Sequence, residues 1–428
     1  MKKKLFFVIE KIHQKIFGHE MSKEMKNFLH GLSWSVVSGI IIMPIILLVN
    51  TLAGRLMGPT EYGKYNLLLI INQFLIIFIF FGLDTTIVKY ISKATSFKSK
   101  KMIISTISIF NIIILLVVMF FISLIYLYQI NLPNNYSLFM IILGIYTFSI
   151  SIKSLFDLIN RGLENFRRQS LAKIVETIVV LLSFLLLFVF LKKPSYINLI
   201  FIFCLGAFAA SFYNFSYLFK YFGKGNNKIL ISQLHEGKFF FISSLLMIMY
   251  LSADKLIIGK YLGIKTLGIY SAYYFASFNF FSLIIALITN VFFPISARLK
   301  NKGFTKKIDR LMVFGFVPLI LFSSIATLIL LKIFGREYPI NILYIIGFSI
   351  YCSLFFFLSL YNTVILDVSK NQYKKYLLIT AVINFFTISI YVIIGHLHVI
   401  SISLILFILI INSIITILVQ KKLFINKI

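Results

Sequence analysis

Two stretches of twelve residues decide the fold: GRLMGPTEYGKY at 54–65 and GKYLGIKTLGIY at 259–270. At a constant offset of 205 residues, a cation, three glycines and a tyrosine recur in the same places. Each copy closes one long apolar run of the sequence and opens the next. Self-similarity of this kind indicates an internal repeat, and we therefore predict two related halves, each built from six membrane-spanning helices.

The composition excludes a soluble protein. Of the 428 residues, 60% are hydrophobic and 13% are charged, with a mean hydropathy of +0.97, whereas soluble domains are about 45–50% apolar and about 25% charged. Twelve spanning helices of about 21 residues would use about 250 residues. Little sequence is then left for a domain outside the membrane.

The predicted spans are the apolar runs that lie between polar, glycine- or proline-containing interruptions. They cover 29–54, 63–87, 102–128, 136–158, 170–191, 196–221, 239–258, 267–293, 309–333, 339–365, 376–395 and 397–420. The weakest separation is the last one, because Gly395–His398 is a very short interruption that also fits one bent segment. We expect an all-α integral membrane protein with about twelve transmembrane helices in two pseudo-symmetric six-helix bundles.

The net charge of +29 is explained by membrane topology. Sorted by predicted loop, 33 of the 42 Lys and Arg residues fall on one side and nine on the other. Since basic loops stay in the cytoplasm, this asymmetry predicts a cell-membrane protein with both termini cytoplasmic. It also argues against nucleic acid as a partner.

The predicted organisation has five parts. They are a cytoplasmic amphipathic segment at 1–27, a six-helix bundle at 28–222, a cytoplasmic linker at 223–238, a second bundle at 239–420 and a cytoplasmic tail at 421–428. The polar, glycine-containing composition of 223–238 is typical of a connection between repeated halves. The first segment has an apolar run too short for a cleaved signal peptide, so we expect it to be retained.

The repeat and its surroundings resemble a known family. The stretch at 52–65, followed by Phe81-Gly-Leu-Asp and Lys89-Tyr-Ile-Ser, is similar to the first two helices of O-antigen (Wzx-type) flippases of the multidrug/oligosaccharidyl-lipid/polysaccharide (MOP) exporter superfamily. The stretches at 253–270 and 161–166 resemble later parts of the same proteins. The resemblance implies a MATE/MOP-like fold around a cationic cavity that moves polyprenyl-pyrophosphate-linked oligosaccharide to the outer leaflet, alongside a polysaccharide polymerase and a ligase.

Charged residues at membrane depth are costly, so they are candidate functional residues. The candidates for binding an anionic lipid-linked substrate are Arg55, Lys64, Lys89, Lys153, Arg161, Lys255 and Lys260. Lysine suits a phosphate as a point charge and arginine as a bidentate clamp. The alternative interpretation is that these cations, with Lys173, extend to lipid headgroups, or that Lys153, Asp157 and Arg161 form an ion-pair chain along one helix.

A coupling ion, H⁺ or Na⁺, has four candidate ligands: Asp84, Asp157, Glu176 and Asp254. The spacing of these acids identifies no cation site, and the membrane potential alone could assist export of an anionic lipid. The tyrosines at 62, 65, 261, 270, 273 and 274 are expected to join the aromatic belt at the membrane surface.

Other classes of function are disfavoured. The predicted outer loops carry few acids, which argues against a membrane enzyme, and the sequence has no ATP-binding G-x-x-x-x-G-K-[ST] motif. Cys204 and Cys352 lie apart, and His396 and His398 are too close in sequence to share a helix face, so no metal site, disulfide or cofactor is expected. The alternatives within reach are a multidrug/cation antiporter of the same superfamily and a lipid-linked peptidoglycan precursor flippase.

Overall fold

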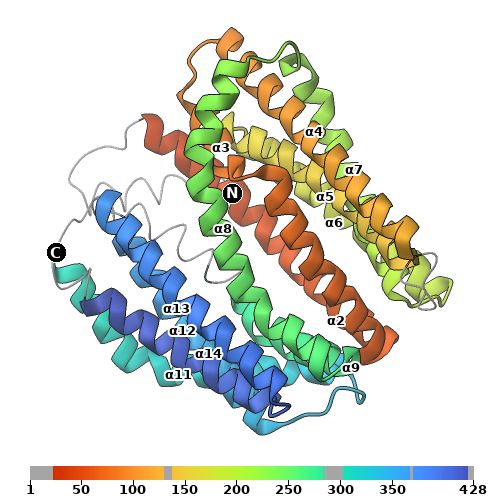
Figure 1. Ribbon diagram of the computed structural model, residues 1–428, viewed down its shortest axis with the longest axis vertical. Helices are drawn as coiled ribbons and strands as arrows, with labels where there is room; N and C mark the ends of the chain where they lie inside the picture. The colour runs from red at the N-terminus through yellow and green to blue at the C-terminus, as the bar shows by residue number, and fades with distance from the viewer. Residues whose placement is uncertain (1–22, 130–136, 283–284, 286–301, 367–369, 423–428) are drawn as a thin grey trace.

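The computed structural model describes residues 23–129, 137–282, 285, 302–366 and 370–422, and in these every regular element is a helix (Figure 1). The α-helices are α2 (Lys23–Phe80), α3 (Leu83–Lys93), α4 (Phe97–Gln129), α5 (Ser137–Gly162), α6 (Phe166–Phe184), α7 (Tyr196–Leu218), α8 (Asn227–Tyr261), α9 (Ile264–Tyr274), α11 (Lys302–Phe334), α12 (Ile342–Leu366), α13 (Lys370–His396) and α14 (Ile402–Gln420). Short π-helical segments continue α6 (Leu185–Phe190) and α9 (Phe275–Asn279), and a 3-10 turn (Phe219–Tyr221) continues α7.

The fold class predicted from the sequence is confirmed. Ten stretches of the described residues are long and apolar enough to cross a membrane. One of them, Val37–Phe80, has 44 residues, which at about 1.5 Å per residue is twice the thickness of the hydrocarbon core, so it supplies two spans. The predicted span 267–293 begins with α9 and extends outside the described residues. These counts agree with about twelve spans.

The two copies of the repeat have similar backbone conformations. Inside α2, Gly58 leaves the helical conformation with φ 75° and ψ 170°. Its counterpart at the offset of 205, Gly263, precedes α9 with φ 87° and ψ 164°. A positive φ is open to glycine at no steric cost, so both copies of the motif break their helix at the same place and in the same way.

The two copies pack directly against each other. A Cβ atom on Gly63 would lie 2.0 Å from the carbonyl oxygen of Ile264, and one on Gly268 would lie 1.8 Å from that of Pro59. Because 63 corresponds to 268 and 59 to 264, these two contacts are one contact repeated by a pseudo-two-fold axis. We call the end of the molecule formed by residues 54–63, 259–268 and 334–341 the junction end.

The halves diverge from the junction end. In Figure 1, α3 to α7 form one group of helices and α11 to α14 another, while α2, α8 and α9 converge at the lower right. The main core runs across the junction and contains side chains of both halves, among them Tyr62, Tyr270 and Phe334. Tyr62, Tyr65, Tyr270, Tyr273 and Tyr274 are at most 8% exposed, so the prediction of a tyrosine belt at the membrane surface is wrong for these five.

Several predicted boundaries move. The second span ends at Phe80 rather than at 87, because the chain turns at Phe81 and Gly82 before the short helix α3. The weak separation near His396 is confirmed, since α13 ends there and α14 begins at Ile402. Residues 227–238 of the predicted linker are the first turns of α8. Most of the amphipathic segment 1–27 and of the tail 421–428 lies outside the described residues, and the division into domains stays a prediction.

Candidate functional site

Two adjoining cavities lie between the halves. The first, of about 310 Å³, is lined by α2, α3, α5, α6 and Ser244 of α8. The second, of about 550 Å³, is lined mainly by α8, α12, α13 and α14. Both include Ile77, Asp84 and Ser244 in their linings, so we treat them as one central cavity with a wall from each half. The cavity does not lie at the junction end, where the two halves pack together. It lies in the part of the molecule where the two halves have diverged.

The wall from the first half is charged. Asp157 and Arg161, four residues apart on α5, both line the cavity, together with Asp84 of α3 and Lys173 of α6. Arg161 and Lys173 are exposed, whereas one carboxylate oxygen of Asp157 is buried and has no hydrogen-bond partner in the described part of the chain. Asp84 accepts a hydrogen bond of 2.9 Å from the backbone N–H of Thr85. The wall thus offers two cations that could hold a phosphate and two acids that could hold a cation.

Lys153 is occupied by an acid of the next helix. Its Nζ lies 2.5 Å from Oε1 of Glu176 on α6, and both side chains are at most 20% exposed. The predicted ion-pair chain along α5 is therefore wrong for Lys153, because this residue pairs with Glu176 of α6 rather than with Asp157. This pair places two of the predicted site residues together, but in a structural contact next to the cavity.

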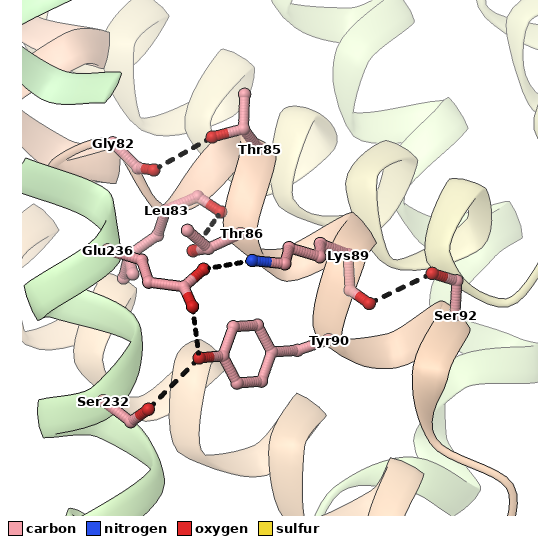
Figure 2. Close-up of polar contacts among 9 residues, drawn as sticks. All are labelled: Gly82, Leu83, Thr85, Thr86, Lys89, Tyr90, Ser92, Ser232 and Glu236. Atoms are coloured by element: carbon pink, nitrogen blue, oxygen red, sulfur yellow. Dashed lines mark hydrogen bonds and ion pairs between the residues drawn. The ribbon is translucent and has the colours of Figure 1, made fainter. Parts of the chain in front are cut away.

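Lys89 joins α3 to α8. Its Nζ lies 2.5 Å from Glu236, and the hydroxyl of Tyr90 lies 3.1 Å from Ser232 and 3.3 Å from Glu236. Figure 2 shows how these four side chains connect the two helices. The hydrogen bond and charge of Glu236 raise the pKa of Lys89. These contacts fix the first turns of α8, the first helix of the second half, against α3 of the first half.

Asp254 and Lys255 lie on α8 about one turn beyond Tyr250 and Leu251, which line the central cavity, but neither is itself a lining residue. Asp254 is 2% exposed and accepts a hydrogen bond from the hydroxyl of Tyr270. The Nζ of Lys255 lies 3.9 Å from Asp254 and 3.6 Å from the ring centroid of Tyr274. The cation predicted to bind substrate is thus next to an acid predicted to bind a coupling ion.

The remaining predicted cations lie at or near the junction end. Arg55 lines a separate pocket of about 790 Å³ with Lys332, Arg336 and Glu337. Lys260 is exposed and lies 5.2 Å from the ring centroid of Tyr261. Lys64 forms an ion pair of 2.6 Å with Glu61, whose other oxygen accepts a hydrogen bond from the start of α7.

The wall from the second half contains none of the residues predicted from the sequence except Asp84, which extends into it from the first half. It is lined by uncharged polar side chains on α12, α13 and α14, namely Asn362, Tyr376, Thr380, Asn384, Asn412, Ser413 and Thr416. The signal that could have found them is their spacing. Positions 376, 380 and 384 on α13, and 412 and 416 on α14, recur every four residues within largely apolar stretches, which places each set on one helix face.

Comparisons with known proteins agree with this architecture. Residues 28–300 match the family model described as polysaccharide biosynthesis protein. No curated protein matches the sequence.

Solved structures of similar fold belong to one superfamily. A multidrug resistance MATE family transporter of the MOP superfamily, in an inward-facing conformation, has a TM-score of 0.65 at 13% identity, over 90% of this chain and 97% of that one. The outward-facing form described in the same words has a TM-score of 0.63 at 13% identity, over 91% of this chain and 93% of that one.

A MOP superfamily transporter from Pyrococcus furiosus, described as having a binding pocket of reversed polarity that suggests a different function, has a TM-score of 0.62 at 13% identity, over 91% and 93% of the two chains. Identities this low establish the fold alone. The chain therefore has the fold of MOP-superfamily transporters.

Proposed function

The chain belongs to the polysaccharide biosynthesis protein family, and from this premise we propose that it moves polyprenyl-pyrophosphate-linked oligosaccharide, the repeat unit of an O-antigen, capsule or similar polysaccharide, from the cytoplasmic to the outer leaflet. The family and the MOP transporter fold support a transporter rather than an enzyme. The observation that carries the proposal is the central cavity, which lies between two pseudo-symmetric halves as alternating access requires.

The pyrophosphate has a candidate site on the charged wall. Arg161 and Lys173 are exposed cations that line the same cavity from α5 and α6. Charge-assisted hydrogen bonds from such groups to phosphate oxygens are about twice as strong as neutral ones. We propose that these two residues hold the headgroup while the cavity faces the cytoplasm, as the distribution of basic loops predicts.

The lipid tail has an apolar route beside this site. A groove of about 220 Å³ between α2 and α6 is lined by Ile42, Met43 and Ile46, and Lys173 lines both this groove and the charged part of the central cavity. An amphiphile needs a polar pocket and an apolar path side by side, because its prenyl chain stays in the bilayer while its headgroup crosses. We propose that the chain lies in this groove.

Energy for export can come from the membrane potential. An inside-negative potential of 100 mV favours outward movement of each negative charge by about 2.3 kcal/mol. We propose that H⁺ or Na⁺, if coupled, binds at Asp84 or Asp157, which line the cavity, rather than at Glu176, which is paired with Lys153, or at Asp254, which is not a lining residue.

The test is the appearance of a fluorescent polyprenyl-pyrophosphate oligosaccharide in the outer leaflet of proteoliposomes at fixed potential. We expect transport by the wild type and at least a tenfold loss in Arg161→Ala and Lys173→Ala. Lys98→Ala, an exposed cation outside the cavity, is the matched control. Arg55→Ala and Lys260→Ala test whether the junction-end cations act after the substrate has crossed.

The outcomes separate the alternatives. Wild-type protein that exports cationic dyes but no lipid would favour the multidrug antiporter, for which the two acids of the charged wall would be the binding groups. Transport confined to a lipid-linked peptidoglycan precursor would favour the second alternative. Lipid transport that is equal in the wild type and both cavity variants would keep the function and refute the site.

A further inference from the structure

The uncharged wall of the central cavity is more polar than helix packing requires. On α13, Tyr376, Thr380, Asn384 and Thr387 occupy one face over a stretch of twelve residues, a length of about 16 Å. On α14, Asn412, Thr416 and Gln420 form a second row, and Asn362 of α12 completes the set. Polar side chains at membrane depth are rare and mark ligand pathways or helix contacts. Here they do both, because most of them also line the cavity.

These side chains form two hydrogen-bonded clusters. Asn362 Oδ1 accepts hydrogen bonds of 2.6 Å from Tyr376 and of 2.6 Å from Gln420. Deeper in the bundle, Asn412 Nδ2 donates to Thr387 at 2.6 Å and to Asn384 at 3.5 Å. The clusters hold amide and hydroxyl groups in fixed positions at the cavity surface.

The clusters are not fully satisfied by the protein. Gln420 is 0% exposed, and its side-chain oxygen has no hydrogen-bond partner within the described residues. Asn384 is half-buried, lines the cavity, and its amide oxygen is held by one long contact. Gln420 does not line the cavity, so the oxygen that a ligand can reach is that of Asn384. A ligand that donates a hydrogen bond to this oxygen supplies the partner that the protein does not fully provide.

The chemistry of the wall selects a neutral ligand rich in hydroxyl groups. All lining residues of this part of the cavity are uncharged except Asp84, which belongs to the first half. Amides and hydroxyls can both donate and accept hydrogen bonds, as sugar hydroxyls do, but they carry no positive charge to balance the charge of a phosphate. The opposite wall carries the charges.

We propose that the wall formed by α12, α13 and α14 is a glycan subsite, which binds the oligosaccharide while the charged wall holds the pyrophosphate. This inference rests on the proposed function and adds an orientation: the glycan lies against the second half and the phosphates against the first. Substrate selection then resides in the second half, because a site built to hydrogen-bond hydroxyl groups discriminates strongly against ligands that lack them.

The test measures binding of two kinds of lipid to the purified full-length protein in detergent. The probes are fluorescent polyprenyl pyrophosphate without sugar and the same lipid carrying each of three different neutral trisaccharides. The variant is Asn384→Leu/Thr380→Val, which removes two polar groups from the cavity wall at nearly constant volume. The control is Ser389→Ala on the same helix, whose hydroxyl bonds only to the backbone of its own helix among the described contacts.

We expect at least one trisaccharide to bind the wild type more tightly than the bare lipid does, and the double variant to lose about tenfold of this affinity. The affinity for the bare lipid should stay unchanged in both the variant and the control. Wild-type protein that gains nothing from any of the sugars would overturn the glycan subsite, as would a variant that weakens both kinds of lipid equally. Failure of the wild type to bind even the bare lipid would count against the proposed function itself.

Discussion

A single added methyl group at the junction end should shift the conformational equilibrium of the protein. In Gly268→Ala the new Cβ atom would lie 1.8 Å from the carbonyl oxygen of Pro59, 2.7 Å from its carbonyl carbon and 3.0 Å from the nitrogen of Gly63. All three are backbone atoms, so no side-chain rotation relieves the contact. Ordinary contact begins at 3.4 Å, so α9 and α2 must separate by about 1.6 Å to relieve the overlap with the carbonyl oxygen.

Overpacking of this kind typically costs about 1–3 kcal/mol. If the cost falls on the conformation in which the junction end is packed, the equilibrium shifts about 5- to 150-fold toward conformations in which it is open. The pseudo-two-fold axis predicts the same effect at the equivalent glycine. Gly63→Ala would place its Cβ atom 2.0 Å from the carbonyl oxygen of Ile264, so it should produce the same shift.

The assay is a distance measurement between spin labels at Leu56 and Ile340, which are exposed on the two halves at the junction end. Both native cysteines are buried and are replaced by serine in the background. We expect a longer distance to become dominant in both variants. Gly39→Ala, with no atom within 4 Å of the added Cβ, should keep the distribution of the parent protein.

A Gly268→Ala protein that keeps both the parent distance distribution and the parent melting temperature would refute the close backbone contact at the junction end. A lower melting temperature with no change in distance would mean that the contact stabilises the fold but does not open. A shift in only one of the two glycine variants would contradict the pseudo-symmetric arrangement of the junction.

Three further predictions concern contacts seen in the structure. Tyr338→Phe removes a hydrogen bond of 2.8 Å to a backbone carbonyl of α2. It should shift the free energy between the packed and open forms of the junction end by about 1 kcal/mol toward the open form, measured with the same spin labels. Lys153→Met leaves the carboxylate of Glu176 without its 2.5 Å partner; thermal unfolding should show a loss of about 2 kcal/mol, and the double variant Lys153→Met/Glu176→Leu should recover part of it, whereas no recovery would contradict a specific pair. Lys89 and Glu236 are 45% and 39% exposed, so a double-mutant cycle on unfolding should give less than about 1 kcal/mol at low salt and still less at high salt. Because the folded protein raises the pKa of Lys89, this contribution is fully present at neutral pH and is lost only as the pH rises above about 10.4.

The repeat motif could be interpreted from the sequence because its signal is local. The glycines at 58 and 263 adopt similar positive φ angles of 75° and 87°, and the glycines at 63 and 268 allow the close approach of two backbones. The positive φ is a requirement of a single position of the chain, and glycine meets it without strain. The close approach at 63 and 268 is a tertiary contact, and the sequence shows only that glycine recurs there. A repeated glycine pattern therefore predicts a repeated bend before any tertiary contact is known.

The partners of the charged residues could not be predicted in the same way. Lys153, Asp157 and Arg161 share one face of α5, yet Lys153 pairs with α6 while the other two line the cavity. Sequence spacing gives the neighbours along a helix but not the helix that packs beside it. For the same reason, the polar rows of α13 and α14 could be assigned to a binding site only once the structure placed both on one cavity wall.

The sequence by itself determined that the chain is an all-helical membrane protein of two repeated halves, because apolar run length and glycine position are properties of the chain alone. Only the tertiary structure decided which charges pair, which face the central cavity, and that the two walls of the cavity differ in charge. The physical reason is that lipid is as apolar as a leucine side chain. The lipid-facing and protein-facing sides of a spanning helix therefore look alike in sequence, and the packing of neighbouring helices settles the difference.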